Sequence, residues 1–200
     1  MEAQMKEFFD TIRPLFRRMS QDQVDGCNTL LAATDGLHIT FRSYLLATTF
    51  HETANTLQPI TERGGRRYFD KYEPWGRIGP RLGNTEPGDG WRYRGRGYVQ
   101  ITGRRNYALA SRVLGIDLIG NPDLALEPSI AAKILVRGCC DGWFTGKALH
   151  DYLPGDYLNA RRVVNGTDRA RKIAGYAETF EAAIEAMRGA ASPPTTAFGR

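Results

Sequence analysis

The chain of 200 residues contains few cysteines, and they do not suit a disulfide framework. There are three in total, an odd number, and Cys139 and Cys140 are adjacent while Cys27 is distant. We therefore expect reduced, mostly buried thiols. A zinc site built from Cys139, Cys140 and His150 would have no recognised ligand spacing, so we expect no metal. His38 and His150 are isolated, and we interpret each as a packed or solvated histidine.

Long hydrophobic runs are also absent. No apolar stretch reaches the roughly 20 residues that a helix needs to cross a bilayer, so we expect no transmembrane segment. The opening segment MEAQMKEFFDTIRPLF carries acidic side chains and lacks the basic, then apolar, layout of a signal peptide. We therefore expect synthesis in the cytoplasm without a leader, so that any work outside the membrane needs another export route.

The remaining composition is typical of one globular domain. Hydrophobic residues make up 42% of the chain and charged residues 24%, enough to bury a core. We predict a single domain over residues 1–190, a flexible tail over 191–200, and a monomer. Gly95-Arg96-Gly97 is too short for a phosphate loop and precedes no Lys-Ser/Thr pair, which disfavours nucleotide binding.

Positive charge is concentrated in one part of the chain. Residues 63–105 contain eleven basic and four acidic residues, a net charge of +7. The whole chain has a net charge of +5, so the remaining residues are slightly acidic. Such a stretch suits a polyanion: nucleic acid, an anionic envelope polymer or a phosphate-bearing surface. The alternative is that these arginines tie down loops through carbonyls and carboxylates.

Helical spacing dominates both ends of the sequence. Before residue 56, apolar residues recur at intervals of three and four, and Leu37, Phe41, Leu45 and Thr48 predict one face of a helix on which Glu52 is the next position. After Thr102, the patterns predict four helices, over 106–114, 129–136, 156–164 and 170–187, with caps at Gly115 and near Gly138.

Between these helical parts, residues 58–100 are rich in glycine and proline and lose helical periodicity. We predict a loop-rich lobe with a short β-hairpin. Tyr68-Phe69 is expected to start a strand after a turn, and the segment 91–102, WRYRGRGYVQIT, alternates well enough for extended structure. A long ordered loop segment within a compact domain usually has a functional reason.

Glu52 is the most informative residue. It is predicted at the end of an apolar helix face, beside His51, where the chain enters the polar, glycine-rich segment. A carboxyl group that is half desolvated in this way is available as a general acid near neutral pH. The alternative is a salt bridge from Glu52 to one of the many arginines.

Glycoside hydrolysis would need a second carboxylate, to activate water or attack the anomeric carbon. Glu62 lies in the loop-rich lobe that would face the helix end, and Asp70 and Glu73 are its rivals. The tryptophans Trp75, Trp91 and Trp143 are candidates for stacking on sugar rings, although buried anchors are the more frequent outcome.

Three segments resemble the family 19 glycoside hydrolases, which include chitinases and related phage endolysins. They are His51-Glu52-Thr53, the string 93–103 (YRGRGYVQITG) with Asn106-Tyr107 after it, and 161–166 (RRVVNG). The resemblance covers residues 41–180. It implies a mainly α, lysozyme-like fold of two lobes with a substrate cleft between them, and hydrolysis of a β-1,4-linked N-acetylated sugar polymer with inversion.

The resemblance also implies roles for residues. Glu52 would be the general acid, Glu62 the general base, and Thr102 would hold the attacking water; a threonine that ends an extended stretch presents its hydroxyl at little entropic cost. The sugar contacts would be Gln100 and Asn165, with His51 ordering its neighbour and Tyr98 and Asn106 as candidates for the cleft wall. Two carboxylates and a positioned water suffice, so no cofactor is expected.

The sequence departs from the family where Ala54-Asn55 replace the glycine that often follows the first motif. The lack of disulfides, the length and the start of the chain favour the endolysin branch, whose enzymes collect in the host cytoplasm and reach the wall in the periplasm after the inner membrane is breached. The expected function is cleavage between N-acetylmuramic acid and N-acetylglucosamine in peptidoglycan, with the basic lobe held against the anionic envelope. The alternatives are a chitinase and a non-catalytic module that binds cell wall or another polyanion.

Overall fold

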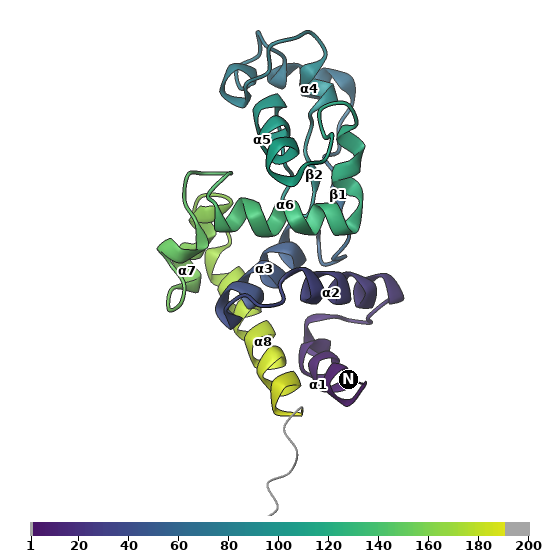
Figure 1. Cartoon of the computed structure of the whole chain (residues 1–200), viewed down its shortest axis with the longest axis vertical. Coiled ribbons are helices and arrows are strands. Elements are labelled where there is room, and N and C mark those ends of the chain that lie inside the picture. Colours follow the sequence, from purple (N-terminus) through teal and green to yellow (C-terminus); the bar gives the residue numbers. More distant parts are fainter. Residues whose placement is uncertain (1, 191–200) are drawn as a thin grey trace, which may run out of the picture.

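The computed structural model describes residues 2–190 and is mainly α, as the sequence predicts (Figure 1). Its helices are α1 (Glu2–Ile12), α2 (Gln21–Ala33), α3 (Ile39–Glu52), α4 (Asp89–Arg92), α5 (Arg104–Leu114), α6 (Pro128–Cys140), α7 (Tyr157–Ala160) and α8 (Ala170–Gly189). Short 3₁₀ helices occupy Arg13–Leu15, Arg66–Tyr72, Gly79–Leu82, Pro122–Leu126, Leu149–Asp151 and Arg161–Val163. The strands β1 (Ile60–Thr61) and β2 (Arg96–Gly97) form a two-stranded antiparallel sheet.

Helix α3 lies at the centre of the larger hydrophobic core. Every residue from Thr40 to Phe50 except Phe41 is buried, so the helix is covered on all sides rather than along one stripe. The Phe50 ring packs against Phe180 of α8 with centroids 6.1 Å apart, and Phe180 also stacks on Phe8 of α1 at 6.5 Å. This packing fixes the axis of α3 and thereby the position of its last residue, Glu52.

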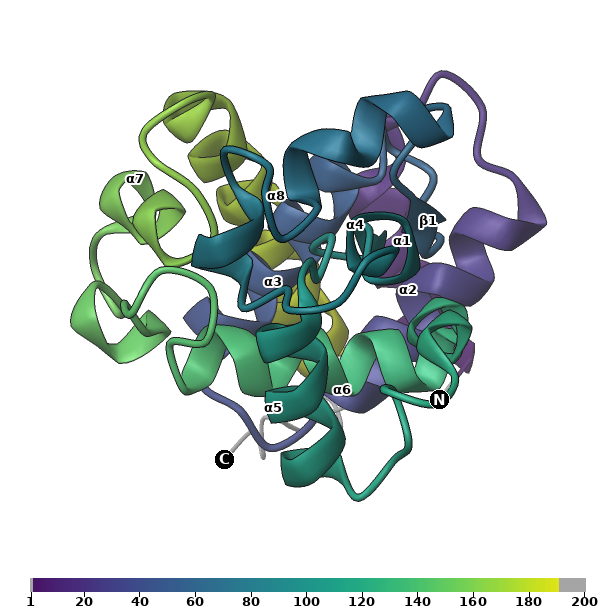
Figure 2. The same cartoon turned by 90° about the horizontal axis from the view of Figure 1, so that it is seen from above.

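A second, smaller core lies in the part of the molecule that holds α4, α5 and the two strands (Figure 1). Tyr93 and Tyr107 pack together there with ring centroids 5.3 Å apart. Helix α6 crosses between the two parts and contributes to both cores, Ile134 to the smaller one and Leu135 to the larger one. Figure 2, seen from above, shows α5 and α6 crossing. Helix α6 therefore couples the two parts of the molecule.

The loop-rich lobe is ordered by buried charge rather than by regular secondary structure. Asp89 is 2% exposed and accepts two hydrogen bonds from the Arg104 guanidinium, at 2.7 and 2.6 Å, and two more from the amides of Thr85 and Glu86. Glu73, also buried, accepts from the amide of Gly88 at 2.8 Å. These carboxylates substitute for a hydrophobic core in a segment that has few apolar residues.

Two strand predictions in this lobe are wrong. Tyr68-Phe69 lies in the 3₁₀ helix 66–72, where the buried Phe69 ring packs edge-on against Trp91, with centroids 5.4 Å apart. One aromatic pair is too short to establish the period of two that defines a strand. In the segment 91–102, Trp91 and Arg92 end α4. Extended pairing there is limited to Arg96–Gly97, which pairs with the distant β1, and to one local antiparallel bridge between Arg96 and Ile101.

Helix boundaries after residue 100 also differ from prediction. Helix α6 continues through Gly138 to Cys140. The Phe144 ring covers Gly138 so closely that a Cβ at this position would lie 2.2 Å from the ring. The glycine is therefore required by packing and does not end the helix. The helix expected over 156–164 is divided into α7 and the 3₁₀ helix 161–163. Gly115 does end α5, in the left-handed conformation with φ of 67°.

The thiols follow the sequence prediction: Cys27 and Cys139 are buried and Cys140 is half-buried. The predicted tail, 191–200, lies outside the described residues. Across residues 2–190, no helix is both long enough and apolar enough to span a bilayer.

Asp89→Asn tests the charge that orders the loop-rich lobe. Burial alone would raise the pKa of Asp89, but the bonds from Arg104 and the amides outweigh it, so its pKa lies below the ordinary 3.8. A lowered pKa stabilises the fold above pH 3.8, and this contribution is lost as the pH falls through the folded-state value. At pH 7 we expect Asp89→Asn to lower the free energy of unfolding by about 2–4 kcal/mol.

The measurement is urea denaturation at pH 7 and pH 3, where the difference between wild type and variant should shrink. Asp10→Asn is the matched control, because Asp10 pairs with Lys6 on the surface, where solvent screens the interaction, and it should contribute much less to stability. Equal effects of the two substitutions at pH 7 would contradict this explanation.

Candidate active site

Glu52 is the last residue of α3, as predicted, and its side chain is 22% exposed. Its Oε1 accepts a hydrogen bond from Arg161 Nη1 at 2.5 Å. The salt bridge that the sequence left open as an alternative is therefore present. The carboxyl group combines one buried, ion-paired oxygen with partial access to solvent, and so it can still meet a ligand.

Arg161 is 2% exposed and is the largest fully buried side chain of the described residues. Besides pairing with Glu52, it donates from Nε to the backbone carbonyl of Asp168 at 3.1 Å. Its guanidinium thus joins the end of α3 to the loop that precedes α8. The sequence alone assigns no role to this residue, although Arg161 is the first residue of the RRVVNG segment that resembles the family.

His51 precedes Glu52 and is half-buried. Burial lowers the pKa of His51, and the positive charges of Arg161, Lys172 and Arg169 lower it further, against the opposing effect of Glu52. The neutral imidazole is therefore the favoured form near neutral pH. The electrostatic potential at this end of α3 is therefore made more positive by three side chains, Arg161, Lys172 and Arg169.

Glu62 follows β1 and is held by groups from two directions. Tyr72 donates its hydroxyl to Oε1 at 3.0 Å, and Lys71 Nζ lies 3.9 Å from the same oxygen. Its backbone amide donates to the carbonyl of Gly95 at 2.8 Å, and the Gly95 amide donates to Oε2 at 3.2 Å. Burial raises the pKa of Tyr72, and the negative charge of Glu62 raises it further, so the phenol stays protonated and can donate. The Glu62 side chain remains 19% exposed.

The Gln100 side chain approaches Gly95 close to the Glu62 carboxylate. Its side-chain amide donates to the carbonyl of Ile60 at 2.9 Å, and its backbone has a positive φ of 55°. A Cβ on Gly95 would lie 2.8 Å from Gln100 Oε1 and 3.1 Å from Glu62 Oε2. Glycine at this position is therefore what lets Glu62 and Gln100 approach the same point of the chain.

Thr102 is half-buried and donates its hydroxyl to the carbonyl of Gln100 at 2.7 Å. Because the proton is used in this bond, the lone pairs of Oγ1 are left to accept from a water molecule. The Asn106 side chain donates to the Thr102 carbonyl at 2.9 Å and fixes the backbone there. The structure thus brings Glu62, Gln100, Thr102 and Asn106 into one bonded group around β2.

The structure places other candidates elsewhere. Tyr98 is 1% exposed and packs in the larger core, so its expected place on a cleft wall is wrong: the segment YVQI turns this ring inward. Asn165 is exposed and accepts from the Gly166 amide. Of the rivals to Glu62, Glu73 is engaged in ordering the lobe and Asp70 is exposed.

The tryptophans also differ from one another. Trp75 is 70% exposed, whereas Trp91 lies between the guanidinium groups of Arg66 and Arg94, 5.2 and 4.1 Å from its ring centroid. Within residues 2–190, no three His, Cys, Asp or Glu side chains gather as a metal ion would require.

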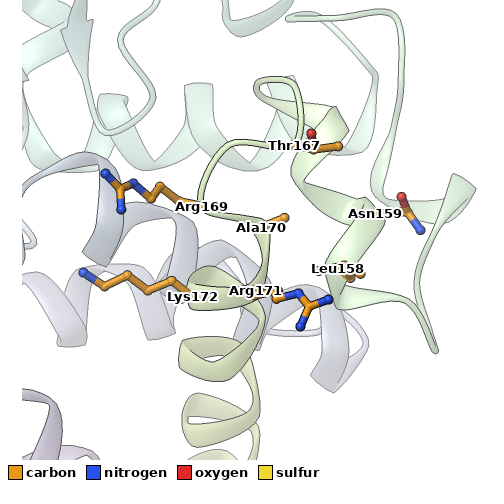
Figure 3. Close-up of a pocket in the computed structure, with 7 residues that line it drawn as sticks. All are labelled: Leu158, Asn159, Thr167, Arg169, Ala170, Arg171 and Lys172. Atoms are coloured by element: carbon orange, nitrogen blue, oxygen red, sulfur yellow. The ribbon is translucent and has the colours of Figure 1, made fainter.

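A pocket of about 480 Å³ opens where α7 meets the start of α8 (Figure 3). It is lined by Leu158, Asn159, Thr167 and residues 169–172. The Asp168 carbonyl that Arg161 binds lies on the same loop as Thr167 and Arg169, so the pocket shares this loop with the Arg161–Glu52 pair.

Comparison with known proteins agrees with these features. The family model described as chitinase class I matches residues 43–148. The chain is 47% identical over 57 residues to a glycosyl hydrolase family 19 domain-containing protein of Haemophilus influenzae, covering 25% of this chain and 28% of that protein. It is 48% identical over 67 residues to Chitinase 8 of Oryza sativa subsp. japonica, covering 32% and 24%.

Among solved structures, the fold is similar to chitinase C from Streptomyces griseus, with a TM-score of 0.60 and 19% identity over 93% of this chain and 76% of that one. This likeness concerns the fold. The match to the family model shows that the chain belongs to glycoside hydrolase family 19. The matched segments span about a quarter of the length of each of these two curated relatives.

His51→Gln tests the buried, electropositive environment at the end of α3. A histidine whose folded-state pKa is lowered destabilises the fold once the pH falls below its ordinary value of 6.5, because the unfolded chain then binds the proton more tightly. We expect wild type to lose more stability between pH 8 and pH 5 than His51→Gln does. Chemical denaturation at both pH values measures this difference.

The matched control is His150→Gln, because the His150 side chain is 71% exposed. That variant should lose as much stability on acidification as wild type. If His51→Gln also follows wild type, the proposed environment of His51 is wrong.

Proposed function

We propose that this protein hydrolyses β-1,4-linked N-acetylated glycans with inversion, with Glu52 as general acid and Glu62 as general base. The observation that carries the proposal is the placing of Glu52: a half-buried carboxyl group at the end of a fully buried helix, held at one oxygen by Arg161. Membership of family 19 supports the reaction class.

In this mechanism Glu52 uses the oxygen that does not bind Arg161 to protonate the leaving glycosidic oxygen. The Arg161 guanidinium then stabilises the carboxylate that remains. Arg161 acts through Glu52 and is therefore a positioning residue. Because its backbone partner, the Asp168 carbonyl, is fixed, the carboxylate gains its stabilisation without reorganisation of the site.

Glu62 takes the proton of the attacking water, which approaches the opposite face of the sugar. Tyr72 and Lys71 hold its Oε1, leaving Oε2 beside Gly95. Thr102 accepts a hydrogen bond from that water through its free lone pairs. Inverting glycosidases keep their two carboxyl groups about 6.5–9.5 Å apart, which leaves room for this water.

We propose peptidoglycan as the substrate, cut between N-acetylmuramic acid and N-acetylglucosamine, with lysis of the bacterial cell as the result. The net charge of +7 over residues 63–105 supports this choice, because bacterial envelopes are anionic. In this proposal the enzyme passes from the cytoplasm to the wall after the inner membrane is breached. Chitin is the second candidate, and the names of relatives such as Chitinase 8 favour it.

The test is clearing of purified peptidoglycan by wild type, Glu52→Gln and Glu62→Gln, with colloidal chitin in parallel. Each substitution keeps the side-chain shape and removes the titrating group, so we expect activity to fall at least about 100-fold, the lower range for loss of general acid–base catalysis. Mass spectrometry of the fragments should show new reducing ends and intact peptides. Glu178→Gln, an exposed change on α8, is the matched control and should behave as wild type.

Each other outcome has a definite meaning. Full activity in Glu62→Gln would assign the base to another carboxylate, and cleavage of chitin alone would establish the chitinase alternative. Cleavage of neither polymer by wild type would refute the glycosidase proposal and favour a binding module.

Binding to the envelope is tested by neutralising exposed charge in the loop-rich lobe. We expect Arg66→Gln, Arg67→Gln and Arg77→Gln together to weaken binding to purified walls at low salt by about tenfold, since each exposed ion pair contributes up to about 1 kcal/mol and salt screens it. Co-sedimentation at salt concentrations of about 20 to 300 mM, over which the Debye length falls from about 20 to about 6 Å, measures this effect.

The control removes the same charge outside the lobe, at the exposed positions Arg17, Arg18 and Arg112. Equal loss of wall binding in the two triple variants would show that total charge, rather than this lobe, is responsible.

A further inference from the structure

The loop before α8 is tied directly to Glu52. Arg161 uses Nη1 for the Glu52 carboxylate and Nε for the Asp168 carbonyl, so both groups lie against one guanidinium. Residues 169–172 follow immediately on this loop and begin α8. The backbone at the start of α8 is therefore tied, through Arg161, to the carboxyl group to which we assign general acid catalysis.

Three of the four positions 169–172 carry basic side chains, and these point in different directions. In Figure 3, Arg169 and Lys172 extend to the same side of the helix start, while Arg171 extends to the other side, toward Leu158. Arg169 directly follows Asp168, whose carbonyl Arg161 binds, and the charges of Arg169 and Lys172 are among those that lower the pKa of His51, the neighbour of Glu52.

The charges near Arg169 and Lys172 do not cancel. Glu52 is matched by the buried Arg161, and the carboxylate of Asp168, 3.8 Å from Arg169 Nε, is 78% exposed. Lys172 Nζ lies 5.7 Å from the Tyr176 ring centroid and makes no ion pair within residues 2–190. The five charged groups therefore leave an excess of positive charge at this rim.

The backbone at Arg169 is also unusual. Its φ of 59° and ψ of 13° are in the left-handed region, which a residue with a side chain rarely adopts and which glycine adopts freely. An arginine at this position costs stability that a glycine would not, and such backbone strain is common at functional positions.

We infer that Arg169 and Lys172 form a cationic rim beside Glu52 that selects glycans carrying carboxylates over neutral glycans. The inference rests on the proposed function and names the feature by which this site would tell its two candidate substrates apart. The carboxylates of the stem peptides of peptidoglycan fit such a rim, whereas a polymer of N-acetylglucosamine has no charge to offer it. Exposed ammonium and guanidinium groups can follow carboxylates on a flexible branch without a rigid pocket.

The experiment compares two forms of one substrate: soluble peptidoglycan strands with free carboxylates, and the same strands with carboxylates converted to neutral methylamides. The readout is the ratio of kcat/KM on the two forms at low salt. We expect wild type to prefer the free carboxylates and the double variant Arg169→Gln, Lys172→Gln to lose about five- to tenfold of this preference, mostly through KM. The wild-type preference should fade at about 0.5 M salt.

Arg171→Gln is the matched control, because it removes one charge from the same turn of α8 on the other side. Arg169→Gly separates folding from selection: it relieves the left-handed strain, so its Tm should be equal to or above that of wild type while the preference falls. Wild-type cleavage with no preference, or equal preferences in the double variant and Arg171→Gln, would overturn the inference and leave the proposed function standing. Cleavage of neither form by wild type would instead refute the proposed function, and the inference with it.

Discussion

The site depends on the burial of one positive charge. The Arg161 guanidinium has almost no contact with solvent, so it must be satisfied by the protein, and Glu52 and the Asp168 carbonyl satisfy it. Removing one partner of a buried pair typically costs about 3–5 kcal/mol, so the three segments that meet here are fixed together. Helix α3, the 3₁₀ helix 161–163 and the loop before α8 thus share one electrostatic constraint, although 109 residues separate Glu52 from Arg161.

The two proposed catalytic carboxylates are held by different means. Glu52 is positioned by a helix that is buried on all sides, so its backbone has little freedom. Glu62 is positioned by a two-residue strand and by the side chains of Tyr72 and Lys71, which come from the loop-rich lobe. The lobe in turn depends on Asp89 and Arg104. Acid and base are therefore fixed by separate parts of the molecule, and α6, which contributes to both cores, links those parts.

Local pattern explains what could be predicted from the sequence. Helical spacing predicts α3 with Glu52 at its end, and Gly115 as the end of α5, because both follow from neighbours within a few residues. Tyr98 could not be placed, because an alternating segment does not say which side is core. Arg161 could not be paired with Glu52, because 109 residues separate them and many arginines were available. The choice among them is made by tertiary packing.

The most direct test of this account is the configuration of the first product. Two carboxyl groups that activate a water on the face opposite the leaving group must invert the anomeric carbon, so a β-linked glycan must yield the α-anomer at the new reducing end. Proton NMR during the first minutes of hydrolysis, before mutarotation mixes the anomers, measures this ratio. The account predicts that the α-anomer accumulates first. Early accumulation of the β-anomer would contradict it, because retention requires a carboxylate that attacks the sugar itself.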